Sequence, residues 1–232
     1  MNNNTRRFVA IIGVGFLLIM PIKRAFAQSL QQLSAEWWQW ALSIPAVVNP
    51  QLDPDGRNVV VGQHGSVWFL AGVFTGFNGG SAIRTCFVPD DVQLFFPVIN
   101  GVGINTPGIC GSSETPESVN DVRMDAANAI AGVTNLSMTL DGKPFKNLQH
   151  VLSTVFAVAL PEDNVFDSPC ASFGGVPAGI YSPAAGDGYY VLLDPLPVGS
   201  HKLHFSAKGP PPQNPPVQDV TYKLTVVPVS LK

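Results

Sequence analysis

The sequence is poor in charge and in cysteine, and it lacks long apolar runs beyond its first 27 residues. Charged residues make up 12% of the 232 positions, and three residues are cysteines. No later run approaches the roughly 20 apolar residues that a membrane-spanning helix needs, so we expect no membrane span in the rest of the chain. Apolar residues nevertheless make up 46% of the sequence, which is enough for a buried core and excludes a disordered polypeptide.

The sequence also lacks the short motifs that identify common catalytic and nucleotide-binding sites. It contains no G-x-S-x-G nucleophile turn, no phosphate-binding loop, no G-x-G-x-x-G and no C-x-x-C. We therefore predict no reaction and no cofactor. Whether the protein is an enzyme stays open at this point, with a role without turnover favoured.

The first 27 residues have the layout of an export signal. Arg6 and Arg7 precede an apolar run over residues 8–22, and Ala25-Phe26-Ala27 forms an A-x-A cleavage site. The general secretory route and the twin-arginine route both stay open, because Thr5-Arg6-Arg7-Phe8 resembles part of a twin-arginine signal. We expect cleavage after Ala27 and a mature protein in the periplasm or outside the cell.

Removal of this signal makes the chain more acidic. The signal holds four of the 13 basic residues and none of the 16 acidic ones, so nine basic residues face 16 acidic ones and the net charge is −7. An acidic chain without basic clusters is not expected to bind nucleic acid or an anionic membrane.

The three cysteines allow at most one internal disulfide, and export permits it. Cys110 and Cys170 both lie in loops rich in Gly, Ser or Pro, whereas Cys86 lies in the apolar run 82–88. We predict a Cys110–Cys170 disulfide and a buried, free Cys86.

Residues 29–43 are predicted to form a helix, because apolar residues recur there at steps of three and four until Pro45 ends the pattern. Trp37 and Trp40 lie on its inner face. In one interpretation the tryptophans close one end of a β-sandwich. In the other, an exposed Trp38 forms part of an aromatic platform for a sugar or a protein partner.

The rest of the N-terminal half combines strands with a second helix. Thr115 as N-cap and Pro116 in the first turn predict a helix to about Ala131, with Val119 and Val122 among its inner residues. A loop is predicted over 100–114. Runs that are apolar throughout suggest strands covered on both faces; the predicted strands are 58–61, 67–74, 82–88 and 93–99.

Beyond Thr134 the chain is predicted to be entirely β. Asp141-Gly142 is a strong hairpin signal, and a long loop spans 161–179. The predicted strands are 135–140, 145–149, 154–160, 189–193, 201–207 and 220–227. No linker divides the chain, so we expect one unit over 28–232, made of a helix-plus-strand part (28–132) and a β part (133–232).

The β part resembles bacterial immunoglobulin-like domains. The resemblance rests on NLSMTLDGKPF (135–145), LDPLPVGSHKLHFSAK (193–208) and VQDVTYKLTVV (217–227), and it covers Thr134 to Val227. It implies a mainly β fold: an immunoglobulin-like antiparallel β-sandwich with two added α-helices in the N-terminal half.

A second resemblance concerns the N-terminal half. WWQWALSIP, VWFLAG, RTCFVP and LFFPVIN are similar to segments of a group of uncharacterised exported bacterial proteins. This similarity implies export, but it carries no activity and no functional residue.

Few residues are candidates for chemistry. Glu162, Asp163 and Asp167 share the loop 161–179 and are candidate ligand-binding residues, although loop carboxylates are usually only solvated. His201 and His204 lie three apart on a predicted strand, which places them on opposite faces. We therefore predict no metal site.

The sequence thus favours an exported, non-enzymatic binding or structural protein. The partners considered are a cell-surface polysaccharide, another exported protein and a second copy of the chain. A carbohydrate-active enzyme, a carbohydrate-binding module and a secreted toxin or effector are the alternatives. An enzyme of the first kind would need two carboxyl groups facing each other across a groove.

Overall fold

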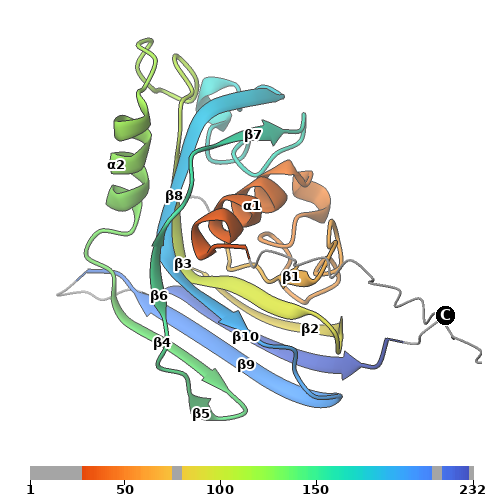
Figure 1. The fold of residues 1–232 in the computed structure, drawn as a ribbon. Coiled ribbons are helices and arrows are strands. Elements are labelled where there is room, and N and C mark those ends of the chain that lie inside the picture. Colours follow the sequence, from red (N-terminus) through yellow and green to blue (C-terminus); the bar gives the residue numbers. More distant parts are fainter. Residues whose placement is uncertain (1–27, 75–79, 211–215, 230–232) are drawn as a thin grey trace, which may run out of the picture.

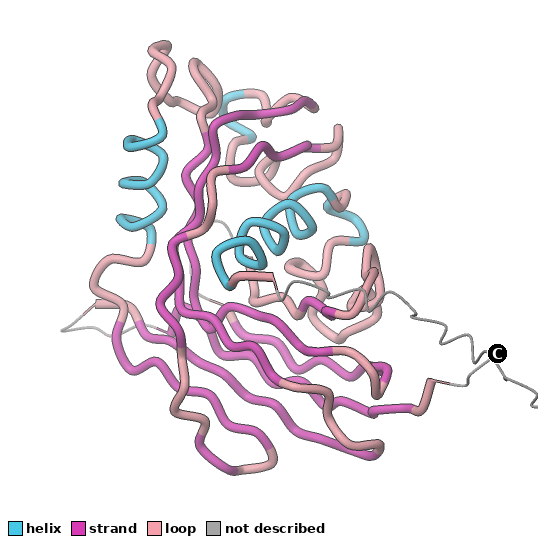
Figure 2. The backbone as a smooth tube through the Cα atoms, in the orientation of Figure 1, coloured by secondary structure: helices cyan, strands magenta, loops and turns pink. Residues whose placement is uncertain are grey.

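A computed structural model describes residues 28–74, 80–210 and 216–229. The predicted export signal, residues 1–27, lies outside the described residues. These described residues form two β-sheets and two α-helices (Figures 1 and 2). In the described part of the chain, no helix is long and apolar enough to cross a membrane.

The helices and strands follow one another along the whole described chain. In order, they are α1 (Leu30–Ser43), the 3₁₀ turn η1 (Ala46–Val48), β1 (Val67–Phe69), β2 (Ser81–Pro89), β3 (Gln93–Ile104), α2 (Val119–Ala129), β4 (Thr134–Leu140), β5 (Lys143–Pro144), β6 (Gln149–Leu152), β7 (Phe156–Leu160), the 3₁₀ turn η2 (Ala171–Phe173), β8 (Gly179–Leu193), β9 (Gly199–Lys208) and β10 (Pro216–Val227).

The two sheets are mixed. The first sheet has the order β1-β3-β8-β6, with β7 also paired to β8, and the second sheet has the order β2-β10-β9-β4-β5. β1 runs parallel to β3, and β2 runs parallel to β10. The prediction of a mainly β fold with two helices in the N-terminal half is confirmed, but the prediction of wholly antiparallel sheets is wrong. The reason is that β2 crosses into the second sheet between β1 and β3, so the chain returns to the first sheet in parallel.

The middle of the first sheet is covered on both faces. On one face, Phe95 and Tyr190 pack with the tryptophans of α1. On the other face, Phe96 stacks on Phe205 of the second sheet with 5.2 Å between ring centroids. Further along the same face α2 takes the place of the second sheet (Figure 1). Coverage from both sides explains why the sequence of β3 is apolar throughout.

The first helix forms where it is predicted. Ser29 and Gln32 form a capping box at its start. Two of its tryptophans are buried with their indole N–H groups satisfied, because Trp37 Nε1 donates to Leu70 O at 3.0 Å and Trp40 Nε1 donates to Val61 O at 2.9 Å.

The second helix begins later than predicted. Ser118, not Thr115, is its N-cap, because Ser118 and Asp121 form a capping box and Asn105 Oδ1 accepts from the preceding Glu117 N. Val122 is buried as predicted, whereas Val119 is exposed.

The predicted strand over 58–61 is a series of turns instead. The buried Asp53 carboxylate accepts hydrogen bonds from the N–H groups of Asp55, Gly56 and Asn58, and these bonds coil the chain. The apolar Val59 is buried in the core but is not part of a strand.

The predicted loop over 100–114 is also partly wrong, because β3 continues to Ile104. The glycines that suggested a loop allow a helix to pack closely on a strand. A Cβ atom at Gly103 would lie 2.1 Å from Val122 O, and one at Gly101 would lie 2.5 Å from Ala129 Cβ.

A fully buried arginine connects the second sheet to the chain that follows β1. Arg84 on β2 is 0% exposed. Its Nε donates to Asp53 O at 2.7 Å, Nη2 donates to Gly72 O at 3.1 Å, and Nη1 donates to Ala71 O and to Tyr222 Oη. In the described ranges no carboxylate oxygen lies within ion-pair distance of it.

These bonds explain why β1 ends at Phe69 and not at residue 74 as predicted. The backbone oxygens of Ala71 and Gly72 bind Arg84, and the backbone N–H and C=O of Val73 bind the side-chain amide of Gln218. Because side chains bind these four backbone groups, residues 71–73 do not have to pair with a neighbouring strand.

Replacing Arg84 should therefore strongly destabilise the fold. Arg84→Met leaves several buried carbonyl oxygens without donors, and we expect a loss of about 3–5 kcal/mol in the free energy of unfolding. Arg84→Lys keeps the charge but supplies fewer directed donors, so its loss should be smaller. Urea unfolding of the purified protein measures both. Arg57→Met is the control, since Arg57 is exposed and should contribute little; an Arg84→Met protein as stable as this control would contradict the assignment.

The predicted Cys110–Cys170 disulfide is confirmed, with 5.2 Å between the Cα atoms. It joins the loop after β3 to the start of η2, and so holds the loop 161–178 against the end of the first sheet. Cys86 is free and buried, also as predicted. Burial raises the pKa of the Cys86 thiol to about 12.

Cys86 should consequently be unreactive in the folded protein. Iodoacetamide at about pH 8 requires a thiolate, and a thiol with a pKa of about 12 supplies almost none. Intact mass should be unchanged for the native protein, rise by one alkyl group in denaturant, and rise by three after denaturation with reduction. Rapid alkylation of the native protein would show that Cys86 is accessible.

Candidate functional site

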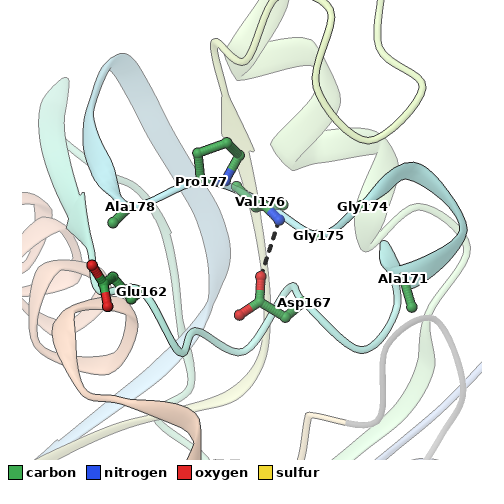
Figure 3. Close-up of a pocket in the computed structure, with 8 residues that line it drawn as sticks. All are labelled: Glu162, Asp167, Ala171, Gly174, Gly175, Val176, Pro177 and Ala178. Atoms are coloured by element: carbon green, nitrogen blue, oxygen red, sulfur yellow. Dashed lines mark hydrogen bonds between the residues drawn. The ribbon is translucent and has the colours of Figure 1, made fainter.

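The acidic loop that the sequence singles out forms one side of an open basin. Glu162 and Asp167 both line this basin, together with Ala171 and residues 174–178 (Figure 3). Figure 3 shows Glu162 near Ala178 and Asp167 beside Val176, at different places on the rim.

Two of the three predicted carboxylates accept backbone hydrogen bonds, Asp167 from its own loop and Asp163 from η1. Asp167 Oδ1 accepts from Val176 N at 3.0 Å, and Oδ2 accepts from Asn164 N at 2.9 Å. Asp163 Oδ2 accepts from Val47 N at 3.1 Å. Glu162 is exposed and makes no hydrogen bond to a described residue. The arrangement therefore stabilises the loop, and it does not form a pair of facing carboxyl groups.

Trp38 does not form an exposed platform. Its side chain is buried, with 6% of the residue exposed, and it packs against β8 so closely that a Cβ at Gly186 would lie 2.4 Å from Trp38 Nε1. The interpretation of Trp38 as an exposed sugar-stacking residue is therefore wrong, although Trp38 is among the residues that line a cavity beside β3.

The histidines of β9 lie on opposite faces, as predicted. His201 Nδ1 is 2.8 Å from Asp141 Oδ2 at one end of the strand, and His204 Nε2 is 2.8 Å from Asp219 Oδ1 on the exposed face of the second sheet. Among the described residues, no group of three or more His, Cys, Asp or Glu side chains could hold a metal ion.

The later half of β3 has an open backbone edge, which the sequence did not reveal. β1 pairs only with residues 93–95 of β3. Further along, Asn105 N donates to Pro183 O next to β8, and β3 pairs with β8 in continuous register from Ile99 to Ile104. Because backbone groups alternate in direction along a strand, the N–H groups of Asn100, Val102 and Ile104 point away from β8. In the described ranges no backbone group pairs with them.

Two cavities lie along this open edge. The first, of about 320 Å³, we call the tryptophan cavity. Its walls combine aromatic rings with amide side chains and one stretch of β3; they include Trp37, Trp38, Phe74, Phe166, Gln51, Gln218 and residues 99–102. Gln51 Nε2 and Trp38 Nε1 are buried donors without a hydrogen-bond partner in the described structure.

The second cavity, of about 330 Å³, we call the acidic cavity. Val102, Gly103 and Ile104 of β3 form its floor. Its other walls are mainly apolar, from Ile109, Leu160, Phe166, Val176 and the disulfide, and two carboxyl groups, Glu117 and Asp125, complete it.

The polar side chains beside the open edge of β3 differ between the two cavities. Burial raises the pKa of Tyr190 to about 12, so its phenol is neutral, and it accepts from Asn100 Nδ2 at 3.3 Å. Burial, together with the Asp125 carboxyl and the charge of Asp121, raises the pKa of Glu117. The lining of the tryptophan cavity therefore holds no carboxyl group, whereas that of the acidic cavity holds two.

Sequence reasoning missed the edge residues because Gly101 and Gly103 suggested a loop. One signal was present, since Asp121 and Asp125 are four residues apart and share one face of α2, and Glu117 lies four residues before Asp121, just ahead of the N-cap Ser118.

The open edge makes a direct prediction for hydrogen exchange. In the free protein, the amides of Val102 and Ile104 should exchange on the order of a hundredfold faster than those of Gly101 and Gly103, which bond to β8. Amide exchange followed by NMR measures each rate. Equal protection of all four amides would show that the edge is already paired.

Comparison of the chain with protein-family models, curated proteins and solved structures finds no match among any of the three.

Proposed function

We propose that the protein is an exported binding protein that holds an extended segment of another exported polypeptide against the open edge of β3. The observation that carries the proposal is the unpaired backbone of Asn100, Val102 and Ile104 between two cavities. A bound strand would complete the hydrogen bonding of this edge, which is the β-augmentation mode of peptide recognition.

A polypeptide fits this edge better than a polysaccharide does. Backbone N–H and C=O groups on a strand repeat at every second residue, which is a spacing of about 6.6–7 Å, and another extended backbone has the matching repeat. The two cavities, lined by residues 99–102 and 102–104 of β3, offer space for side chains of such a segment. The carbohydrate alternatives have less support, because Trp38 is buried and the carboxylates of Asp163 and Asp167 bind backbone N–H groups.

Export is part of the proposal. Residues 1–27 have the composition of an export signal, and a disulfide between two distant loops is typical of proteins in an oxidising compartment. The partner would be met in that same compartment.

A bulky side chain at Ala129 should block binding. Ala129 is exposed at the end of α2 and lines the tryptophan cavity beside Gly101. Peptides selected from a random linear library on the purified protein should bind Ala129→Trp at least about tenfold more weakly. Ala127→Trp is the matched control, because Ala127 is exposed on the same helix and lines neither cavity.

The same peptides should protect the amides of Val102 and Ile104 from exchange in the complex. Failure to select any peptide, or equal binding by Ala129→Trp and Ala127→Trp with both variants folded by circular dichroism, would refute the proposed function.

A further inference from the structure

We propose that the acidic cavity receives the side chain of an arginine or lysine residue of the bound segment. This inference rests on the proposed function and names the specificity of one of its two cavities.

The shape of the cavity suits a long side chain with a charged end. Apolar groups of Ile104, Ile109, Leu160 and Val176 line it, and they match the methylene stem of lysine or arginine. The carboxyl groups of Glu117, just before α2, and of Asp125 on α2 line the same cavity. An arginine fork binds carboxylates in a bidentate manner, and an ammonium group binds them as a point charge.

The negative charge of the cavity is not balanced from within the described structure. The ion pairs of the described residues involve Arg57, His150, His201 and His204, and none of them reaches Glu117 or Asp125. Arg123, the only basic residue of α2, forms no ion pair with either carboxyl group. Burial and the neighbouring Asp125 carboxyl both raise the pKa of Glu117, and a cation placed between the two carboxyl groups would relieve the repulsion between them.

The position of the cavity connects it to the strand edge. Val102 and Ile104 carry the free N–H groups and also form the cavity floor. A residue that pairs with β3 at this level has its side chain within reach of Glu117 and Asp125. Glu117 and Asp125 would therefore favour arginine or lysine at one position of the bound segment, while backbone pairing would accept many residue types at the other positions.

The test uses two small probes of equal shape. Nα-acetyl-arginine methylamide carries a guanidinium group, and the corresponding citrulline derivative carries a neutral urea group. In NMR titrations of the isotope-labelled protein, the arginine probe should shift the amide signals of Gly103 and Asp125, and the citrulline probe should not. The double variant Glu117→Gln/Asp125→Asn should weaken binding of the arginine probe by about tenfold or more.

A matched double variant controls for the change in net charge. Glu114→Gln/Glu162→Gln removes two exposed carboxylates that do not line this cavity, and it should bind the arginine probe like the unmodified protein. The inference is overturned if both probes bind equally, if neither probe binds, if both double variants behave alike, or if Ca²⁺ produces the shifts and the arginine probe does not.

These outcomes are separate from those of the peptide selection. Selected peptides that bind the edge without an enriched arginine or lysine would leave the proposed function intact and refute this inference. Binding of the arginine probe without selection of any peptide would refute the proposed function and leave only a cavity that binds a free guanidinium group.

Discussion

The buried guanidinium of Arg84 is the constraint on which the open edge depends. A buried cation without a carboxylate partner is costly to desolvate, and here the cost is offset by hydrogen bonds to the oxygens of Asp53, Ala71, Gly72 and Tyr222. Because those bonds satisfy the carbonyl oxygens of Ala71 and Gly72, the chain after β1 separates from β3 without leaving these oxygens unpaired. As a consequence, the later half of β3 has no second neighbouring strand among the described residues.

The two helices then flank the edge without covering it. Gly101 and Gly103 allow α2 to lie directly on one face of β3, and Gly186 allows Trp38 of α1 to lie directly on β8 from the other face. Both helices pack on the faces of the sheet (Figure 1), so neither offers backbone donors or acceptors to the strand. A space remains along the edge, and the disulfide between Cys110 and Cys170 holds one end of its wall in place.

What could be predicted from the sequence was local. The helix with WWQW, the Asp141-Gly142 hairpin and the opposite faces of His201 and His204 follow from periodicities of a few residues. The disulfide followed from loop composition and by eliminating Cys86. The parallel pairs and the end of β1 could not be predicted, because they depend on Arg84 and Gln218 bonding to residues far away in the chain. The burial of Trp38 could not be predicted for the same reason, because Trp38 packs against Gly186, which lies about 150 residues away in the sequence.

The treatment of the other strand edges argues that the open edge of β3 has a purpose. Long uncovered edges invite unwanted strand pairing, and folded proteins usually protect them. At the exposed edge of β2, Thr85 N donates to Asp55 O, and Gly56 packs against the Thr85 backbone. The opposite edge of the second sheet ends in β5, which has two residues. In the first sheet, Gln39 of α1 donates to Ala157 O on β7. The described residues cover or shorten these edges but leave β3 open beside two cavities, and this contrast supports the proposed partner strand.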